Sequence, residues 1–168
     1  MLLHIKLMMP DRTLPDINDG HRLDVPETSR MYQRLLPADV RLRWTYEDCP
    51  AGKPDYASVA LPWSGLLVMR TGWSAQDTWA LLDAGPFGRG HQHEDKLSVL
   101  LYAGGKLLLT EGGNYAYDGS PMRNYVLSTH AHNTVLVDGK GQDRRSRYDW
   151  PDGDISKKDA DFCWNIGK

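Results

Sequence analysis

Cysteine, net charge and long apolar runs are all scarce in this chain of 168 residues, and each scarcity argues against a class of protein. The two cysteines, Cys49 and Cys163, form no CxxC motif and are too few for a disulfide-framed scaffold. A formal net charge of −2 provides no general attraction to nucleic acid or anionic membrane. No apolar stretch reaches transmembrane length, and residues 1–10 lack the features of a signal peptide. The length and ordinary composition predict one domain with its own core.

Proline punctuates the N-terminal part of the chain, up to about residue 56. Helical signals there are weak, apart from a short helix predicted over residues 29–36, capped by Thr28 and ended by Pro37. We interpret residues 1–56 as a connector or peripheral layer outside the core.

From about residue 57 the pattern becomes that of β structure. Glycine-rich turns separate short apolar runs at hairpin spacing, which predicts an all-β domain over residues 57–168 with an antiparallel sheet or sandwich. The predicted strands cover residues 64–70, 78–84, 95–102, 106–111 and 132–137.

Four of the six histidines lie in two pairs with one residue between them, and each pair precedes an apolar run. If the first run begins as a strand, His91, His93 and Asp95 share one face, because alternate side chains of a strand point the same way. His130 and His132 repeat the arrangement. The repetition favours one shared site for metal binding or proton transfer over two solvated strand ends.

The hairpin around residues 103–105 decides where Glu111 lies. A three-residue loop pairs Tyr102 with Lys106 and brings Glu111 to the face of His93. A two-residue loop pairs Glu111 with Ser98 and sends it to the other face, because a slip by one residue inverts a strand. We prefer the first register, which the turn residues do not force.

Several segments resemble the heparinase II/III-like family of polysaccharide lyases. They are GHQHEDKLS, YAGGKLLLTEGGNYAYDG, Arg123-Asn124-Tyr125, STHAHNTVLVDG and Gln142, in an order and spacing that fit over roughly residues 63–142, together with LPDINDG at residues 14–20. The family pairs an N-terminal α/α toroid with a C-terminal antiparallel β-sandwich. The resemblance therefore implies the end of the connector plus the front of the sandwich, without the toroid and truncated at the C-terminus. It also implies a periplasmic or secreted parent protein.

The resemblance assigns a role to each residue that matches a family motif. His91 matches the histidine that faces the substrate. His93 and His132 match the first and last ligands of a structural zinc ion, which organises one wall of the cleft. Glu111 stands where the family usually has aspartate, so a third ligand is expected there in altered form.

The chemistry implied for the parent is β-elimination from a uronate-containing glycan. This reaction needs neutralisation of the uronate carboxylate, a base for the C5 proton and an acid for the leaving O4 oxygen. His91 suits carboxylate polarisation or proton transfer, and the phenols of Tyr117 and Tyr125 are further acid–base candidates. Arg123 would bind the acidic substrate, or lower a tyrosine pKa as a neighbouring cation. The family toroid supplies the rest of the site, so the isolated chain is expected to be inactive.

Two other functions stay open at this point. The chain could be a non-catalytic module that binds acidic sugar or serves as structure. It could also be a metal-dependent hydrolase with Glu94 as general base, although on a strand Glu94 would point away from His93. The sequence leaves the glycan open among heparan sulfate, alginate and other uronates.

Overall fold

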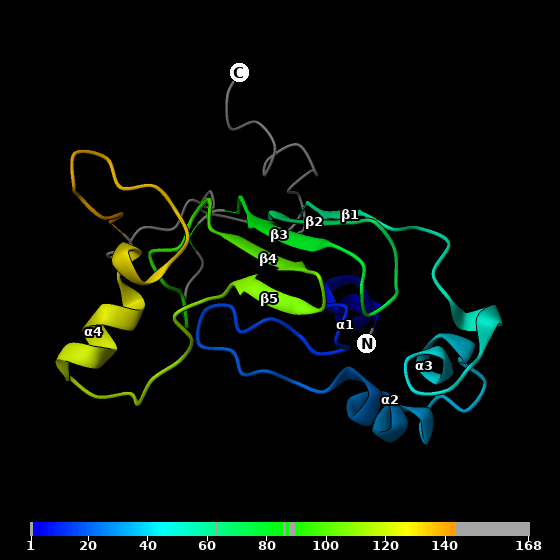
Figure 1. The fold of residues 1–168 in the computed structure, drawn as a ribbon. Helices are drawn as coiled ribbons and strands as arrows, with labels where there is room; N and C mark the ends of the chain where they lie inside the picture. Colours follow the sequence, from blue (N-terminus) through cyan, green and yellow to red (C-terminus); the bar gives the residue numbers. More distant parts are fainter. Residues whose placement is uncertain (1, 63, 86, 88–89, 144–168) are drawn as a thin grey trace.

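The computed structural model describes residues 2–62, 64–85, 87 and 90–143 (Figure 1). Its helices are α1 (Leu2–Leu7), α2 (Val25–Gln33), α3 (Val40–Trp44) and α4 (Pro121–Leu127), with the short 3₁₀ turns η1 (Pro50–Gly52) and η2 (Thr129–Ala131). Its strands are β1 (Val59–Leu61), β2 (Leu66–Arg70), β3 (Trp79–Asp83), β4 (Val99–Ala103) and β5 (Lys106–Leu109). Cys163 and the end of the predicted domain lie outside the described residues.

The five strands form one antiparallel sheet in which each strand pairs with its neighbour in sequence. Val68, Leu81 and Leu100 lie opposite one another on β2, β3 and β4 and are almost completely buried. Alternate residues of these strands face the core, as a period of two requires. The prediction of an antiparallel β fold is confirmed.

The β4–β5 hairpin has a two-residue loop, so the predicted three-residue loop is wrong. Gly104 and Gly105 have φ values of 58° and 76°, and Ala103 lies directly opposite Lys106. Consecutive positive φ values match the twist of a hairpin and favour glycine at both positions. A β-bulge beside Tyr102 then shifts the register once more. This second shift pairs Leu109 with Leu101, so from Leu109 onward the strand regains the face that the three-residue register predicts, with a different partner.

Two predicted strands differ from the structure. The strand predicted over residues 95–102 begins only at Val99, so both residues of the first histidine pair lie on a loop. Residues 132–137 form no strand, although Val137 makes an isolated bridge to Lys140 across a left-handed turn. Val135 and Val137 are 66% and 69% exposed. Apolar β-branched residues predict a strand only where a neighbouring strand pairs with them, and here none does within the described residues.

The helices of the N-terminal segment are short and begin at capping residues. Helix α2 begins at Val25, earlier than predicted, because the Asp24 carboxylate accepts a hydrogen bond from the Glu27 amide (2.7 Å) and Pro26 occupies the first turn. Thr28 therefore lies inside the helix. In the described ranges, no helix has both the length and the apolar character needed to cross a membrane.

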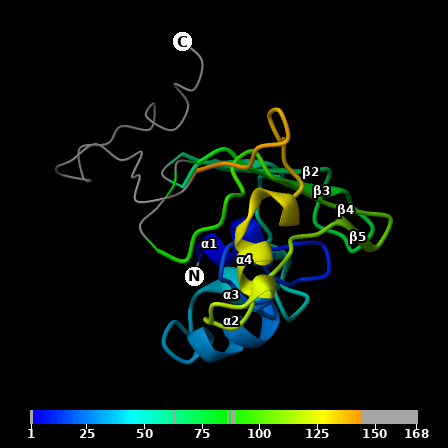
Figure 2. The same ribbon diagram turned by 90° about the vertical axis from the view of Figure 1, so that its left-hand side faces the viewer.

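Residues 1–56 contribute to the core, which corrects their interpretation as a purely peripheral layer. Leu7 and Met9 pack with Trp79 and Leu81 beneath the sheet. Figures 1 and 2 show α1, α2 and α3 on the same side of the sheet, with α1 nearest to it. The opposite face carries partly exposed apolar side chains such as Met69, at 49%. A second sheet over that face, as in a sandwich, stays a prediction.

Candidate functional site

The site begins where a tight turn of the N-terminal segment meets the loop of the first histidine pair. The Gly20 amide donates to the Ile17 carbonyl (3.0 Å), which closes the turn. From this turn the Asp19 amide donates to the His91 carbonyl (3.2 Å), and the Asn18 side chain accepts from the His93 amide (3.2 Å). The backbone of the loop of the two histidines is thus held by hydrogen bonds to a segment more than 70 residues earlier.

The Asp19 carboxylate lies at the centre of the site, and sequence reasoning missed it. Its oxygens are 2.6 and 3.0 Å from the two terminal nitrogens of Arg123, 3.1 Å from His93 Nε2 and 3.3 Å from His91 Nδ1. The side chain is only 2% exposed. Hydrogen bonds from Arg123 hold the pKa of Asp19 well below its usual range, so it is an anion. The sequence signal that includes Asp19 was the LPDINDG motif, but that motif gave Asp19 no role.

His91 and Tyr117 form the exposed part of the site. The His91 side chain is 74% exposed, and its Nδ1 lies 2.9 Å from the Tyr117 hydroxyl. The Arg123 guanidinium lies over the Tyr117 ring, 4.6 Å from its centroid. Arg123 lowers the pKa of Tyr117, as expected for a neighbouring cation, but this effect is outweighed. Desolvation and the Asp19 carboxylate together raise the pKa of Tyr117 above its ordinary value.

Helix α4 carries Arg123 and Tyr125, the other two residues predicted to act on the substrate. Arg123 is 9% exposed at its side chain and donates to Asp19 and to the Asn114 side chain (3.2 Å). Its charge is therefore satisfied within the protein, and its role in substrate binding stays a prediction. Tyr125 is 52% exposed. Among the described residues, no hydrogen bond joins its hydroxyl to the other predicted site residues.

His93 and His132 form the buried part of the site. Their side chains are 1% and 0% exposed, and their ring centroids are 5.3 Å apart. His132 Nδ1 donates to the Glu111 carboxylate, whose other oxygen accepts from the Ser98 hydroxyl (2.7 Å). Burial lowers the pKa of His93, which favours the neutral ring despite Asp19. One histidine of each pair thus reaches a shared position, whereas His130 is exposed.

A close approach between the end of β5 and η2 allows Glu111 to reach His132. A Cβ on Gly112 would lie 3.0 Å from both the Cβ and the carbonyl oxygen of Ala131. From the other side, the Glu94 carboxylate accepts hydrogen bonds from the amide and the hydroxyl of Thr129, at 3.4 and 3.2 Å. Glu94 therefore helps to fix η2, and nothing in this geometry makes it a hydrolytic base.

The two buried histidines each have one nitrogen bonded to a carboxylate and one nitrogen without a partner. The unpartnered atoms, His93 Nδ1 and His132 Nε2, find no hydrogen-bond acceptor or donor among the described residues. Two buried imidazole nitrogens in adjacent rings fit the donor set of a zinc site, in which a carboxylate commonly orients each ring from behind. In the described part of the chain, no three His, Cys, Asp or Glu side chains are arranged to hold a metal. Zinc at this place, and Glu111 as its third ligand, therefore stay predictions.

A buried ion network lies next to this loop and was also missed by sequence reasoning. Lys96 Nζ is 2.7 Å from Asp83 and 3.2 Å from Asp95. The backbone of Lys96 bonds the Gln142 side chain at both its amide (2.9 Å) and its carbonyl (2.8 Å). The network thus connects β3, the histidine loop and residue 142.

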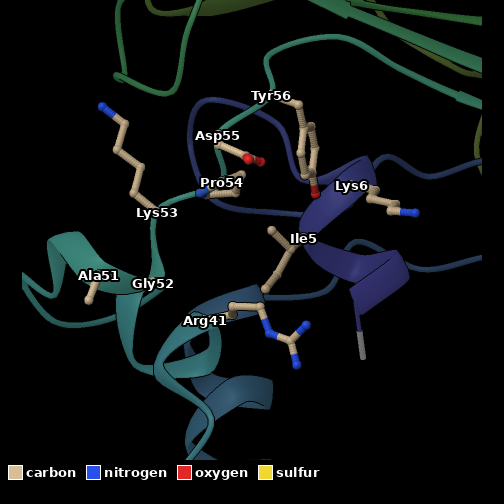
Figure 3. Close-up of a pocket in the computed structure, with 9 residues that line it drawn as sticks. All are labelled: Ile5, Lys6, Arg41, Ala51, Gly52, Lys53, Pro54, Asp55 and Tyr56. Carbon is tan, nitrogen blue, oxygen red and sulfur yellow. The ribbon is translucent and has the colours of Figure 1, made fainter.

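A cavity of about 470 Å³ lies elsewhere in the molecule, between α1, α3 and η1 (Figure 3). None of the predicted site residues line it. Tyr56 extends towards Ile5, whereas Lys53 points away from the cavity. Arg41 is bound to Asp39 (2.6 Å), so its charge is paired within the protein. We assign no function to the cavity.

Comparison with known protein families decides the classification of the chain. The family "Heparinase II/III-like, C-terminal" matches residues 53–158. The chain belongs to this family. The resemblance seen in the histidine motifs is thereby confirmed. No curated protein matches the chain.

Solved structures of heparinases share the fold of this family member. A heparinase III, the BT4657 gene product, is 28% identical with a TM-score of 0.72, over 83% of this chain and 23% of its own. The heparan sulfate lyase HepC from Pedobacter heparinus is 25% identical with a TM-score of 0.70, over 81% of this chain and 23% of its own. A further heparinase III, 17% identical with a TM-score of 0.68, supports the fold alone. The chain thus spans about a quarter of the length of these proteins.

Proposed function

We propose that this chain supplies one wall of the substrate cleft of a polysaccharide lyase, which cleaves uronate-containing glycans by β-elimination. The observation that carries the proposal is the exposed His91–Tyr117 pair, held by a buried anion, in a member of the heparinase II/III-like family. Heparan sulfate is the first substrate to test, because HepC is a heparan sulfate lyase. A helical domain completes the cleft in the parent protein.

The exposed pair suits two of the three tasks of the reaction. His91 lies in reach of an incoming glycan and can polarise the uronate carboxylate or exchange a proton with the sugar. The Tyr117 hydroxyl shares the Nδ1 of His91 and can relay a proton. Tyr125 is also exposed and can contact sugar from α4. The remaining acid–base and carboxylate-binding groups would come from the helical domain.

We also propose a structural zinc ion bound by His93 Nδ1 and His132 Nε2, which are the two buried nitrogens without partners. The geometry favours Glu111 as the carboxylate that orients His132, since it bonds the opposite ring nitrogen. The ion would supply rigidity to this wall of the cleft.

The test measures ultraviolet absorbance of the 4,5-unsaturated uronate in a parent protein that carries the helical domain. The substrates are heparan sulfate, alginate and a second uronate glycan. We expect His91→Ala to lower kcat by about 100-fold or more, because loss of a positioned acid–base group removes about 10²–10⁴ in rate. His130→Ala serves as the matched control, since this histidine is exposed in the second pair, and it should retain activity.

The outcomes separate the proposal from its alternative. The 168-residue chain alone should generate little or no product, because groups that act as a unit fail together. Robust turnover by the isolated chain that His91→Ala abolishes would show that the cleft is already complete. Glycan binding without turnover by the parent would refute the lyase function and favour an acidic-sugar-binding module.

A further inference from the structure

One carboxylate contacts both histidines of the first pair, and it does so through different ring nitrogens. Asp19 Oδ1 lies 3.1 Å from His93 Nε2, and Asp19 Oδ2 lies 3.3 Å from His91 Nδ1. We propose that Asp19 is the positioning residue of the site and holds these two histidines in opposite tautomers. The inference rests on the proposed function for the role of His91, and its test does not.

The contacts define the tautomer of His93. An anionic carboxylate accepts but cannot donate, so the proton of the neutral ring must lie on Nε2. Nδ1 then carries the lone pair, and this is the buried atom that has no hydrogen-bond partner among the described residues. The Asn18 side chain fixes the backbone of the same residue through the His93 amide (3.2 Å). Asp19 therefore leaves the basic nitrogen of His93 at Nδ1, the ring atom that Asp19 does not contact.

For His91 we infer the other tautomer, because the Asp19 carboxylate can only accept a hydrogen bond whereas the Tyr117 hydroxyl can accept or donate one. Its Nδ1 lies between the Asp19 carboxylate (3.3 Å) and the Tyr117 hydroxyl (2.9 Å). A proton on Nδ1 satisfies the anion, and Nε2 is left as the basic nitrogen of a ring that is 74% exposed. His91 therefore presents an unprotonated Nε2 to the substrate before any glycan binds.

Arg123 keeps Asp19 in this position. Its two terminal nitrogens donate to the two carboxylate oxygens at 2.6 and 3.0 Å, a bidentate geometry that fixes the plane of the carboxylate. The Asp19 side chain is 2% exposed, so water does not compete for these bonds. Arg123 thus acts on the histidine loop through the Asp19 anion, although the two residues are 104 apart in the sequence.

The experiment records long-range ¹H–¹⁵N spectra of the metal-free 168-residue chain, labelled at histidine, at about pH 8, where ordinary imidazoles are neutral. We expect His93 to be protonated at Nε2 and His91 at Nδ1. In Asp19→Asn a single amide oxygen replaces two acceptor oxygens, so at least one ring should lose its single tautomer. Asp16→Asn is the matched control on the same segment and should leave both ring patterns unchanged.

Several results would overturn the inference. They are the same tautomer in both rings of the wild type, unchanged patterns in Asp19→Asn, or equal changes in Asp16→Asn. If Asp19→Asn does not fold, the wild-type spectrum alone decides. In a parent with the helical domain, Asp19→Asn should lower kcat about 10- to 100-fold with little change in KM. No turnover by the wild-type parent on any uronate glycan, together with the expected tautomers in the wild-type spectrum, would contradict the proposed function and leave the positioning role standing.

Discussion

Replacement of Lys96 by methionine should destabilise the fold strongly, although Lys96 lies in a surface-adjacent loop. Its side chain is 19% exposed, and its ammonium group contacts two carboxylates that are themselves only 11% and 4% exposed. Methionine retains the length of the side chain but removes the charge, so Asp83 and Asp95 are left as uncompensated buried anions. Removal of one partner from a buried ion pair costs about 3–5 kcal/mol.

Guanidinium denaturation followed by circular dichroism measures this loss directly. For a domain of this size, 1 kcal/mol lowers Tm by about 2–4 °C, so the expected shift is roughly 6–20 °C. Lys106→Met is the matched control, because Lys106 is exposed on β5, and it should change stability by less than about 0.5 kcal/mol. Asp83→Asn and Asp95→Asn added to Lys96→Met should restore most of the lost stability, because no buried charge remains.

The loss in Lys96→Met should also depend on pH. Burial already raises the pKa of Asp83 above its ordinary value of 3.8, and loss of the neighbouring cation raises it further. Between that ordinary value and the raised pKa, the folded state binds more protons than the unfolded state, so the variant regains stability as pH falls. A loss below about 1 kcal/mol, or one that grows as pH falls, would refute the reasoning about buried anions.

Two further predictions concern the buried histidines. Glu111→Gln should weaken zinc binding about 10- to 100-fold without changing the stoichiometry, because Glu111 bonds the far ring nitrogen of His132 and orients the ring. Calorimetry measures both quantities. Complete loss of zinc binding, which we expect for His132→Ala, would instead make Glu111 a ligand. Gly112→Ala should cost about 1–3 kcal/mol in the free energy of unfolding, because its Cβ would crowd Ala131 at 3.0 Å. Ala131→Gly in the same chain should recover part of that loss, and absence of any recovery would contradict the steric explanation.

The sequence alone determined the class of the fold and suggested most residues of the candidate site. Alternating apolar residues and glycine turns were sufficient for an antiparallel sheet, because these signals are local. The two histidine pairs predicted a shared position, and His93 and His132 do lie side by side. Their motifs also led to the heparinase II/III-like family, to which residues 53–158 belong.

Other features depended on contacts between distant parts of the chain. His91 and His93 were expected on a strand, but they lie on a loop that a turn of the N-terminal segment holds. The β-bulge that places Glu111 depends on both strands of a hairpin, and no local pattern encodes it. The run over residues 132–137 has the composition of a strand but lacks a pairing strand in the described residues, so the strand predicted there was wrong.

Asp19 shows most clearly what only the tertiary structure decides. In sequence it is one of 22 acidic residues, in a segment that predicts a connector. In the fold it is a buried anion between His91, His93 and Arg123, the last of which lies 104 residues later. The properties of a carboxylate depend on which cations and hydrogen-bond donors surround it, and only the folded chain brings these groups together. The sequence therefore suggested several chemical groups of the candidate site, and the tertiary structure added Asp19 and determined which of these groups are paired, buried or exposed.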